Sequence, residues 1–178
     1  MSEQRKLVIF IASSLDGYIA TKEDSLEWLF NVEGEGDNGY SEFYETIDTV
    51  VMGKRTYDWL MSQELEEFPY LNKECYVFTS SFHADNEHVQ FVNEEVSSFV
   101  GRLKAQDGKN IWLVGGGELI HHFIKEKVVD ELIITLAPSL LGNGIPLFKE
   151  GDYQLDLALK GLRNFNQFVE LRYEVKSK

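Results

Sequence analysis

The sequence predicts an α/β fold with a mostly parallel central sheet, flanking helices and an antiparallel hairpin at its end. Apolar runs alternate with amphipathic stretches of crossover length, which is typical of a parallel sheet covered on both faces. The last two segments, 156–165 and 167–175, instead alternate apolar and polar residues around a short turn. The chain of 178 residues, 43% of them hydrophobic, can bury a sizeable core. We therefore expect a single domain over residues 1–178.

The N-terminal part predicts a strand, a turn and a helix before a loop. Residues 7–13 are mostly apolar and predict a buried strand. Asp16 and Gly17 then predict a turn before residues 18–20. Residues 25–30 favour a helix, whereas the glycine-rich segment 33–39 favours a loop.

The middle of the chain continues the alternation. Residues 41–47 place their apolar side chains on one face and predict a short helix, and 49–52 predict a strand. Helical spacing returns at 55–61. After a polar connection, strands are expected at 74–79 and 89–92.

The next elements repeat the strand and helix pattern. Asn93 is placed to cap a helix whose apolar positions recur through 96–103. A strand at 111–114 leads into a helix whose apolar side chains span 119–124. The following strand is expected at 131–137.

Net charge and cysteine content limit the classes of partner that we expect the protein to bind and the compartment that we expect it to occupy. The 30 acidic and 17 basic residues give a net charge of −13, which repels nucleic acid and anionic membranes. No apolar stretch is long enough to span a bilayer, and the N-terminus lacks the pattern of a signal peptide. The single cysteine, Cys75, lies in an apolar run and fits a reducing cytoplasm. We expect a cytoplasmic protein with a small-molecule substrate, whose anionic ligands would need a local basic pocket.

Three successive glycines, Gly115, Gly116 and Gly117, lie where a strand passes into a helix. Without Cβ atoms the backbone can adopt a positive φ and let a ligand approach closely, while the first N–H groups of the helix face outward. The pattern favours a phosphorylated cofactor. A tight turn with close packing is the alternative.

A second glycine precedes a helix at Gly53, and Lys54, Arg55 and Thr56 follow it. Cations are unfavourable at a helix N-terminus unless an anion lies between them, so their placement indicates a phosphate clamp. A nucleoside-triphosphate loop would need a glycine five positions earlier, where the chain has Asp48. The alternative is that both cations are solvated.

A third strand end carries the hydroxyls of Thr79, Ser80 and Ser81, which could bind a phosphate or cap a turn. Parallel strands bring such ends to one edge of the sheet. A dinucleotide with an extra ribose phosphate would engage all three places, which predicts NADPH rather than NADH. The first strand lacks G-x-G-x-x-G, so the usual dinucleotide fold is not expected.

Five motifs resemble, in order and spacing, the dihydrofolate reductase-like superfamily, and within it the reductase domain of bacterial riboflavin biosynthesis. They are Ala12–Ala20, Met52–Tyr57, Val114–Leu119, Leu136–Pro138 and Gly142–Phe148. The resemblance covers nearly the whole chain. It implies a homodimer and a central sheet of about eight strands with NADPH lying across the strand ends.

The resemblance also implies site residues. The cofactor-binding residues would be Ala12, Ile19, Gly53, Lys54, Arg55, Thr56, Thr79, Ser80, Ser81, Val114, Gly115, Gly116, Gly117, Glu118, Leu119 and Gly144. Lys54 and Arg55 would confer the preference for NADPH. Ala12 and Ile19 would lie near the nicotinamide, and the turn of Gly144 would approach it from the other side.

The reaction implied is hydride transfer from C4 of NADPH to a carbonyl or imine of a small heterocyclic or sugar-bearing substrate. This is similar to 5-amino-6-(5-phosphoribosylamino)uracil reductase. The alternatives are dihydrofolate reductase activity and a non-catalytic NADPH-binding protein.

The chain departs from both relatives at candidate catalytic positions. Dihydrofolate reductases place an acidic residue near the position of Gly39, and Asp37 is close to it. Riboflavin-pathway reductases usually have an arginine where this chain has Tyr18. Asp16 is the best candidate polar group, as a substrate ligand or proton relay, and a turn-forming role is its alternative. No metal site is expected, because adjacent histidines on a helix do not share a face.

Overall fold

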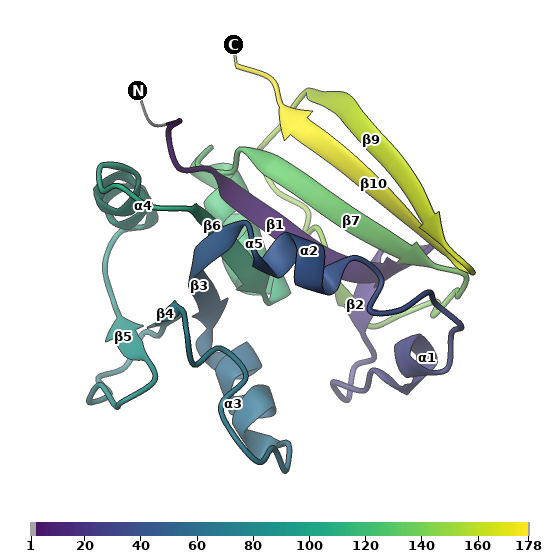
Figure 1. The fold of residues 1–178 in the computed structure, drawn as a ribbon, viewed down its shortest axis with the longest axis horizontal. Helices are drawn as coiled ribbons and strands as arrows, with labels where there is room; N and C mark the ends of the chain where they lie inside the picture. Colours follow the sequence, from purple (N-terminus) through teal and green to yellow (C-terminus); the bar gives the residue numbers. More distant parts are fainter. Residues whose placement is uncertain (1–2, 178) are drawn as a thin grey trace.

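The computed structural model describes residues 3–177, and Figure 1 shows their fold. The strands are β1 (Leu7–Ser14), β2 (Tyr18–Ala20), β3 (Ile47–Gly53), β4 (Glu74–Phe78), β5 (Gln90–Val92), β6 (Asn110–Gly115), β7 (Glu131–Ala137), β8 (Ile145–Pro146), β9 (Leu157–Phe165) and β10 (Phe168–Val175). The helices are α1 (Glu27–Phe30), α2 (Tyr40–Tyr44), α3 (Lys54–Ser62), α4 (Val96–Lys104) and α5 (Gly117–Lys125).

Eight strands form one sheet in the order β5-β4-β3-β6-β1-β7-β10-β9, and β2 pairs with β8 in a separate two-stranded sheet. The six strands from β5 to β7 in this order are parallel. The hairpin of β9 and β10 joins β7 in antiparallel fashion. The predicted α/β class with a mostly parallel sheet and a C-terminal hairpin is confirmed. The carboxyl ends of the six parallel strands lie along one side of the sheet, called the carboxyl edge below.

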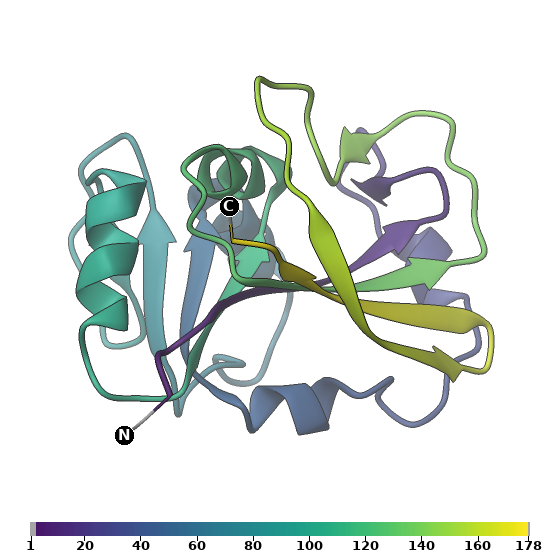
Figure 2. The same cartoon turned by 90° about the horizontal axis from the view of Figure 1, so that it is seen from above.

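Two apolar layers hold the helices on the sheet. On one face, α4 and α5 bury side chains such as Phe99 and Phe123, both fully inaccessible. On the other face, the ring of Phe43 in α2 stacks on Phe10 of β1 with centroids 4.1 Å apart, and Trp112 meets Phe43 edge-on. Figure 2 shows α5 and α2 on opposite sides of the sheet. Among residues 3–177, no helix combines the length and apolarity needed to cross a bilayer.

Three local predictions are wrong or incomplete. The helix expected at 41–47 ends at Tyr44, because Ile47 is fully buried in β3, where it pairs with Asn110. Asn93 does not cap α4, whose N-cap is Glu95 and has no side-chain cap hydrogen bond. Strand β8 was not expected, since two residues are too few to show a period of two.

Candidate functional site

The two glycine turns meet at the carboxyl edge. Strands β3 and β6 are neighbours, with Met52 opposite Gly115. A Cβ atom on Gly53 would lie 3.8 Å from the backbone oxygen of Gly115 and the nitrogen of Gly116. One on Gly116 would lie 3.3 Å from Thr56 Oγ1. The two turns therefore present closely spaced backbone, with Gly115 at φ +135°, a conformation that favours glycine.

The third predicted strand end, after β4, adjoins the Gly53 turn at the end of β3. Phe78 of β4 pairs with Gly53 of β3, so Thr79 and Lys54 follow neighbouring strand ends. The backbone N–H of Ser81 donates to Thr79 Oγ1 at 3.2 Å, and the two hydroxyl oxygens lie 3.3 Å apart. Ser80 is exposed beside them. The structure thus brings the three predicted strand ends together on β4, β3 and β6.

Sequence reasoning did not single out His83 for this region. Its Nε2 lies 3.0 Å from Ser81 Oγ, and its ring lies 5.1 Å from that of Phe91. The only sequence signal was its position two residues after the predicted hydroxyl group.

The small sheet of β2 and β8 packs on the start of α5. A Cβ atom on Gly117 would lie 2.7 Å from the backbone oxygen of Pro146, and one on Gly144 would lie 2.4 Å from that of Ala20. Only glycine fits at these two contacts. Ile19 of β2 packs against the core on the α5 side of the main sheet.

The remaining residues predicted to bind the cofactor differ in whether their backbone or their side chain is accessible to a ligand. Leu119 is buried, and Val114 is half-buried on the α2 side, so their backbone is the part available to a polar ligand. Ala12 lies near the end of β1, opposite Thr135 of β7. Glu118 is exposed and pairs with Lys149, whose ammonium holds the pKa of this carboxyl below its ordinary value.

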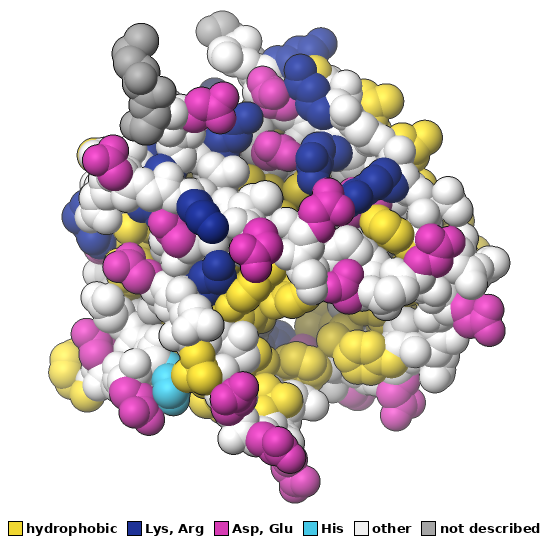
Figure 3. Space-filling model, in the orientation of Figure 1, with side chains coloured by type: hydrophobic (Ala, Val, Ile, Leu, Met, Phe, Trp, Pro, Cys, Tyr) yellow, Lys and Arg dark blue, Asp and Glu magenta, His cyan; other side chains and the backbone are white. Residues whose placement is uncertain are grey.

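Lys54 and Arg55 point to different partners. Lys54 pairs with Asp58 one turn along α3, whereas Arg55 Nη2 donates to both carboxylate oxygens of Asp24, at 2.9 and 3.0 Å. Consecutive helical residues diverge by about 100°, which explains the difference. Arg55 therefore joins α3 to the connection between β2 and α1. Figure 3 shows a hollow below α2, between α3 and β2, with hydrophobic side chains in its walls.

Asp16 fixes the connection between β7 and β8. Its carboxylate accepts hydrogen bonds from Ser14 Oγ at 2.6 Å and from the backbone N–H groups of Gly142 and Leu141 at 2.8 and 3.1 Å. The Ser14 hydroxyl and then the Gly142 N–H lower the pKa of Asp16. Asp16 is therefore ionised at neutral pH and acts there as a hydrogen-bond acceptor.

Asp37 belongs to the loop before α2. Its carboxylate accepts from the hydroxyl and the backbone N–H of Ser41, and these bonds lower its pKa. Gly39, near the position where the resemblance places an acidic residue, has φ +79°. A Cβ atom there would lie 3.0 Å from Arg163 Nη2 and 3.2 Å from the ring of Phe165. The positive φ therefore favours glycine at this position, and a side chain would also require Arg163 and Phe165 to shift.

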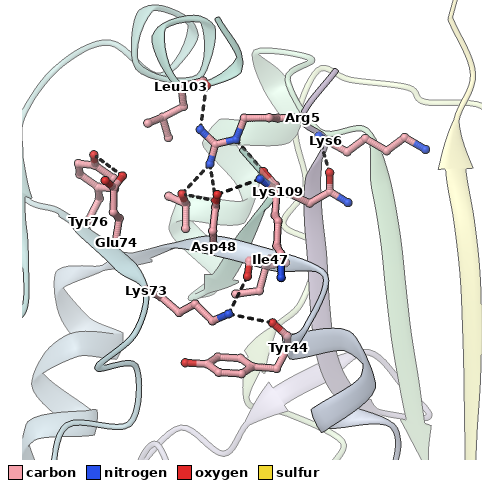
Figure 4. Close-up of polar contacts among 12 residues, drawn as sticks. Arg5, Lys6, Tyr44, Ile47, Asp48, Lys73, Glu74, Tyr76, Leu103 and Lys109 are labelled. Carbon is pink, nitrogen blue, oxygen red and sulfur yellow. Dashed lines mark hydrogen bonds and ion pairs between the residues drawn. The ribbon is translucent and has the colours of Figure 1, made fainter. Parts of the chain in front are cut away.

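A cavity of about 460 Å³ opens at the opposite edge of the sheet, beside Arg5, Asp48 and Lys73. Arg5 is 5% exposed and donates to the Leu103 and Lys109 carbonyls, Asp48 and Thr49. Lys73 Nζ donates to the Tyr44 and Ile47 carbonyls, as Figure 4 shows. Protein oxygens accept the hydrogen bonds of both Arg5 and Lys73. The cluster therefore joins the ends of several strands.

A mostly parallel sheet with this edge site and a C-terminal hairpin defines a dihydrofolate reductase-like α/β protein. The family model of the RibD C-terminal domain matches residues 5–171. The chain belongs to this family, whose fold is that of reductases.

The relatives agree with this assignment. Protein YwjB of Bacillus subtilis (strain 168), itself uncharacterized, is 50% identical over 171 residues, covering 96% of this chain and 98% of its own. A Shewanella sp. PV-4 protein, whose name assigns it to riboflavin biosynthesis, superposes with a TM-score of 0.89 at 31% identity, covering 97% of this chain and 99% of that one.

More distant structures share the fold. The Thermotoga maritima diaminohydroxyphosphoribosylaminopyrimidine deaminase/5-amino-6-(5-phosphoribosylamino)uracil reductase gives a TM-score of 0.71 at 16% identity, covering 97% of this chain and 57% of that one. Dihydrofolate reductase from Enterococcus faecalis, complexed with NADP(H), gives 0.63 at 18% identity, covering 99% of this chain and 100% of that one. The predicted resemblance is therefore confirmed.

Proposed function

We propose that the protein is an NADPH-dependent reductase that transfers a hydride to a carbonyl or imine of a small heterocyclic or sugar-bearing substrate. The observation that carries the proposal is the contact between the Gly53 and Gly115–Gly117 turns, with the hydroxyls of Thr79 and Ser81 on the adjoining strand end. The NADP(H) complex of the Enterococcus faecalis reductase, which has the same fold, supports this choice of cofactor.

The exposed backbone of the two turns fits a diphosphate bridge. In the proposal, residues 53–56 and 115–119 hold this bridge, because helices α3 and α5 begin there and their first N–H groups have no intrahelical partners. Thr79, Ser80 and Ser81 take the adenosine end. Ala12 and Ile19 lie beside the nicotinamide, which supplies the hydride from C4 when bound.

Local charge must offset the net charge of −13. Lys54 and Arg55 follow Gly53 directly and are the cations nearest along the chain to the Gly53 turn. Each is paired with an exposed carboxylate, and such pairs contribute little free energy, so a phosphate can compete for them. We assign both to the extra ribose phosphate of NADPH.

Asp16 and Asp37 are the candidate acidic groups of the substrate site. The pKa of each carboxyl is lowered by hydrogen bonds, so both are acceptors rather than proton donors at neutral pH. We propose that they bind N–H or O–H groups of the substrate and that solvent supplies the proton. The same lowered pKa values favour a second candidate function, an NADPH-binding protein without turnover.

Absorbance of NADPH separates the two functions. The panel contains dihydrofolate, riboflavin-precursor pyrimidines and simple ketones, each mixed with protein and NADPH. A reductase oxidises NADPH with at least one substrate class, whereas tight binding without oxidation across the panel supports the second function. In the double variant Lys54→Ala/Arg55→Ala, affinity should fall far more for NADPH than for NADH, and equal losses would refute the phosphate assignment.

We also propose a cytoplasmic homodimer formed through the outer hairpin. Leu159 and Leu162 of β9 are 60% and 64% exposed, and the register of β9 with β10 places them on the same face as Val169. The ion pair Arg163–Glu170 lies on the opposite face. An uncharged face on an open edge strand favours pairing with its own copy in a strongly acidic protein. The buried free thiol of Cys75 fits the cytoplasm.

A further inference from the structure

We propose that Glu170 of β10 is a substrate-binding residue that accepts a hydrogen bond from an N–H group of a nitrogen heterocycle. The inference rests on the proposed function and deepens it. Among the small heterocyclic or sugar-bearing substrates considered above, it selects those that present an N–H donor.

Glu170 is buried with one oxygen of its carboxylate unpaired. Its side chain is 3% exposed. Arg163 Nε donates to Oε1 at 3.1 Å, and Arg163 Nη2 lies 3.0 Å from the same oxygen. Among residues 3–177, Oε2 has no hydrogen-bond partner. Leaving a buried acceptor unpaired costs free energy, so this oxygen suits a donor that a bound molecule supplies.

The register of the sheet places Glu170 in line with the proposed nicotinamide position. Glu170 pairs with Thr135 of β7, and Thr135 pairs with Ala12 of β1. Paired residues of neighbouring strands point to the same face. This is the face that α2 covers, because Phe10, two residues before Ala12, stacks on Phe43. Two strand spacings separate Glu170 from Ala12 by about 10 Å, which leaves room for one heterocyclic ring between the carboxylate and the nicotinamide.

The charges around Glu170 favour an N–H donor over a phosphate. Arg163 is shared with Glu42, whose Oε2 accepts from Arg163 Nη1 at 3.0 Å. One guanidinium therefore faces two carboxylates. Glu35, whose carboxylate accepts the backbone N–H of Asn166, adds a third negative charge near the hairpin turn. A phosphate would meet an excess of negative charge here, whereas an N–H group would meet an acceptor.

Backbone without a side chain covers Oε2. A Cβ atom on Gly39 would lie 3.6 Å from this oxygen. The loop before α2 is joined to the hairpin turn by hydrogen bonds from Asn166 N–H to Glu35 Oε1 at 3.2 Å and from Gln167 N–H to the Glu33 carbonyl at 3.1 Å. All four residues are exposed, and exposed hydrogen bonds of this kind open at low free energy. A small shift of the loop therefore gives a ligand access to Oε2.

The variant Glu170→Gln reverses the polarity of the unpaired atom and keeps the shape of the side chain. Arg163 can only donate, so it holds the amide oxygen at the place of Oε1. The amide nitrogen then stands at the place of Oε2 and presents hydrogens to the ligand. The matched control is Glu42→Gln, which changes the other partner of Arg163 at a side chain that is 69% exposed.

The probe is benzamidine, a planar cation whose parallel N–H groups suit a carboxylate. Benzyltrimethylammonium carries the same charge and no N–H group. NMR titration of the full chain, followed at the backbone amide of Gly39, measures both dissociation constants. Wild type should bind benzamidine about tenfold more tightly than benzyltrimethylammonium, and in Glu170→Gln this ratio should fall to about one. Glu42→Gln should keep the wild-type ratio.

Three results would overturn the inference. Equal binding of the two cations by wild type would show only a general attraction to an acidic protein. A Glu170→Gln variant with the wild-type ratio would remove Glu170 from the site. A Gly39 resonance that benzamidine leaves unmoved in wild type would overturn the inference even where the variant fails to fold.

Calorimetry with NADPH separates this inference from the proposed function. If wild type binds NADPH and any of these three results is found, the inference alone fails. If wild type does not bind NADPH, the proposed function fails and the substrate role of Glu170 fails with it.

Discussion

Arg55 Nη2 at the start of α3 lies 2.9 Å from Asp24 Oδ1 in the connection between β2 and α1. The pair joins two segments on either side of the hollow in Figure 3. Asp24 holds this position with φ +62°, which is uncommon for a residue with a side chain. A carboxylate thus pairs with a cation that the proposal assigns to a phosphate.

Removing that carboxylate should strengthen cofactor binding. In Asp24→Asn, Arg55 is no longer neutralised, so we expect about a threefold tighter NADPH complex and little change for NADH, in line with the small free energy of exposed ion pairs. Calorimetry with both nucleotides measures the effect. Weaker NADPH binding in the variant would show that the Arg55–Asp24 pair supports the site instead of competing for it.

The contact between Gly117 and Pro146 should tolerate no side chain. A Cβ atom would lie 2.7 Å from a backbone oxygen, so Gly117→Ala should lower the free energy of unfolding by about 1–3 kcal/mol. Gly101 in α4 is the matched control, because a Cβ there meets nothing within 4 Å. Gly101→Ala should raise the free energy of unfolding by about 0.5–1 kcal/mol. Urea unfolding of both variants measures the two changes in the free energy of unfolding. Equal changes would contradict the packing described.

Asp16 should make stability depend on acid pH. Its pKa in the folded chain is below the ordinary value of 3.8. Its stabilising effect is therefore complete above that value and is lost as pH falls through the folded pKa. Asp16→Asn should melt at a lower temperature at neutral pH, and its difference from wild type should shrink on acidification below 3.8. Thermal melts between neutral and acidic pH measure this difference in melting temperature. The control is Glu64→Gln, at an exposed residue. A difference independent of pH would exclude the carboxylate as its source.

The outer face of the hairpin should govern assembly. Wild type should sediment as a dimer, and Leu159→Lys/Leu162→Lys should sediment as a monomer, because two cations would face their symmetry-related copies. Leu65→Lys, at a leucine that is 49% exposed elsewhere, is the control. Sedimentation velocity distinguishes the species. A monomeric wild type, or a dimeric double variant, would refute this interface.

Much of the fold could be predicted because its long elements carry clear periods. Strand β7 and helix α5 have apolar patterns that burial in the structure matches. The end of α2 could not be predicted from the sequence, because Ile47 fits a helix period locally. In the structure Ile47 belongs to β3 and pairs with Asn110 of β6. Tertiary pairing overrides local spacing in such cases.

The site could be predicted in part for a related reason. Glycines before helices and hydroxyls after a strand are sequence signals, and parallel strands bring their ends to one edge. Side-chain direction is not such a signal. Nothing in the order of Lys54 and Arg55 indicated that one would reach along α3 to Asp58 and the other across to Asp24. The position of His83 against Ser81 likewise depends on the path of a loop.

Calorimetric titration of the wild-type chain with NADPH tests the central claim most directly. We predict one NADPH bound per chain, more tightly than NADH, because glycine turns and hydroxyls on three neighbouring strand ends would hold a single dinucleotide. No heat with either NADPH or NADP⁺, in protein shown to be folded, would contradict it.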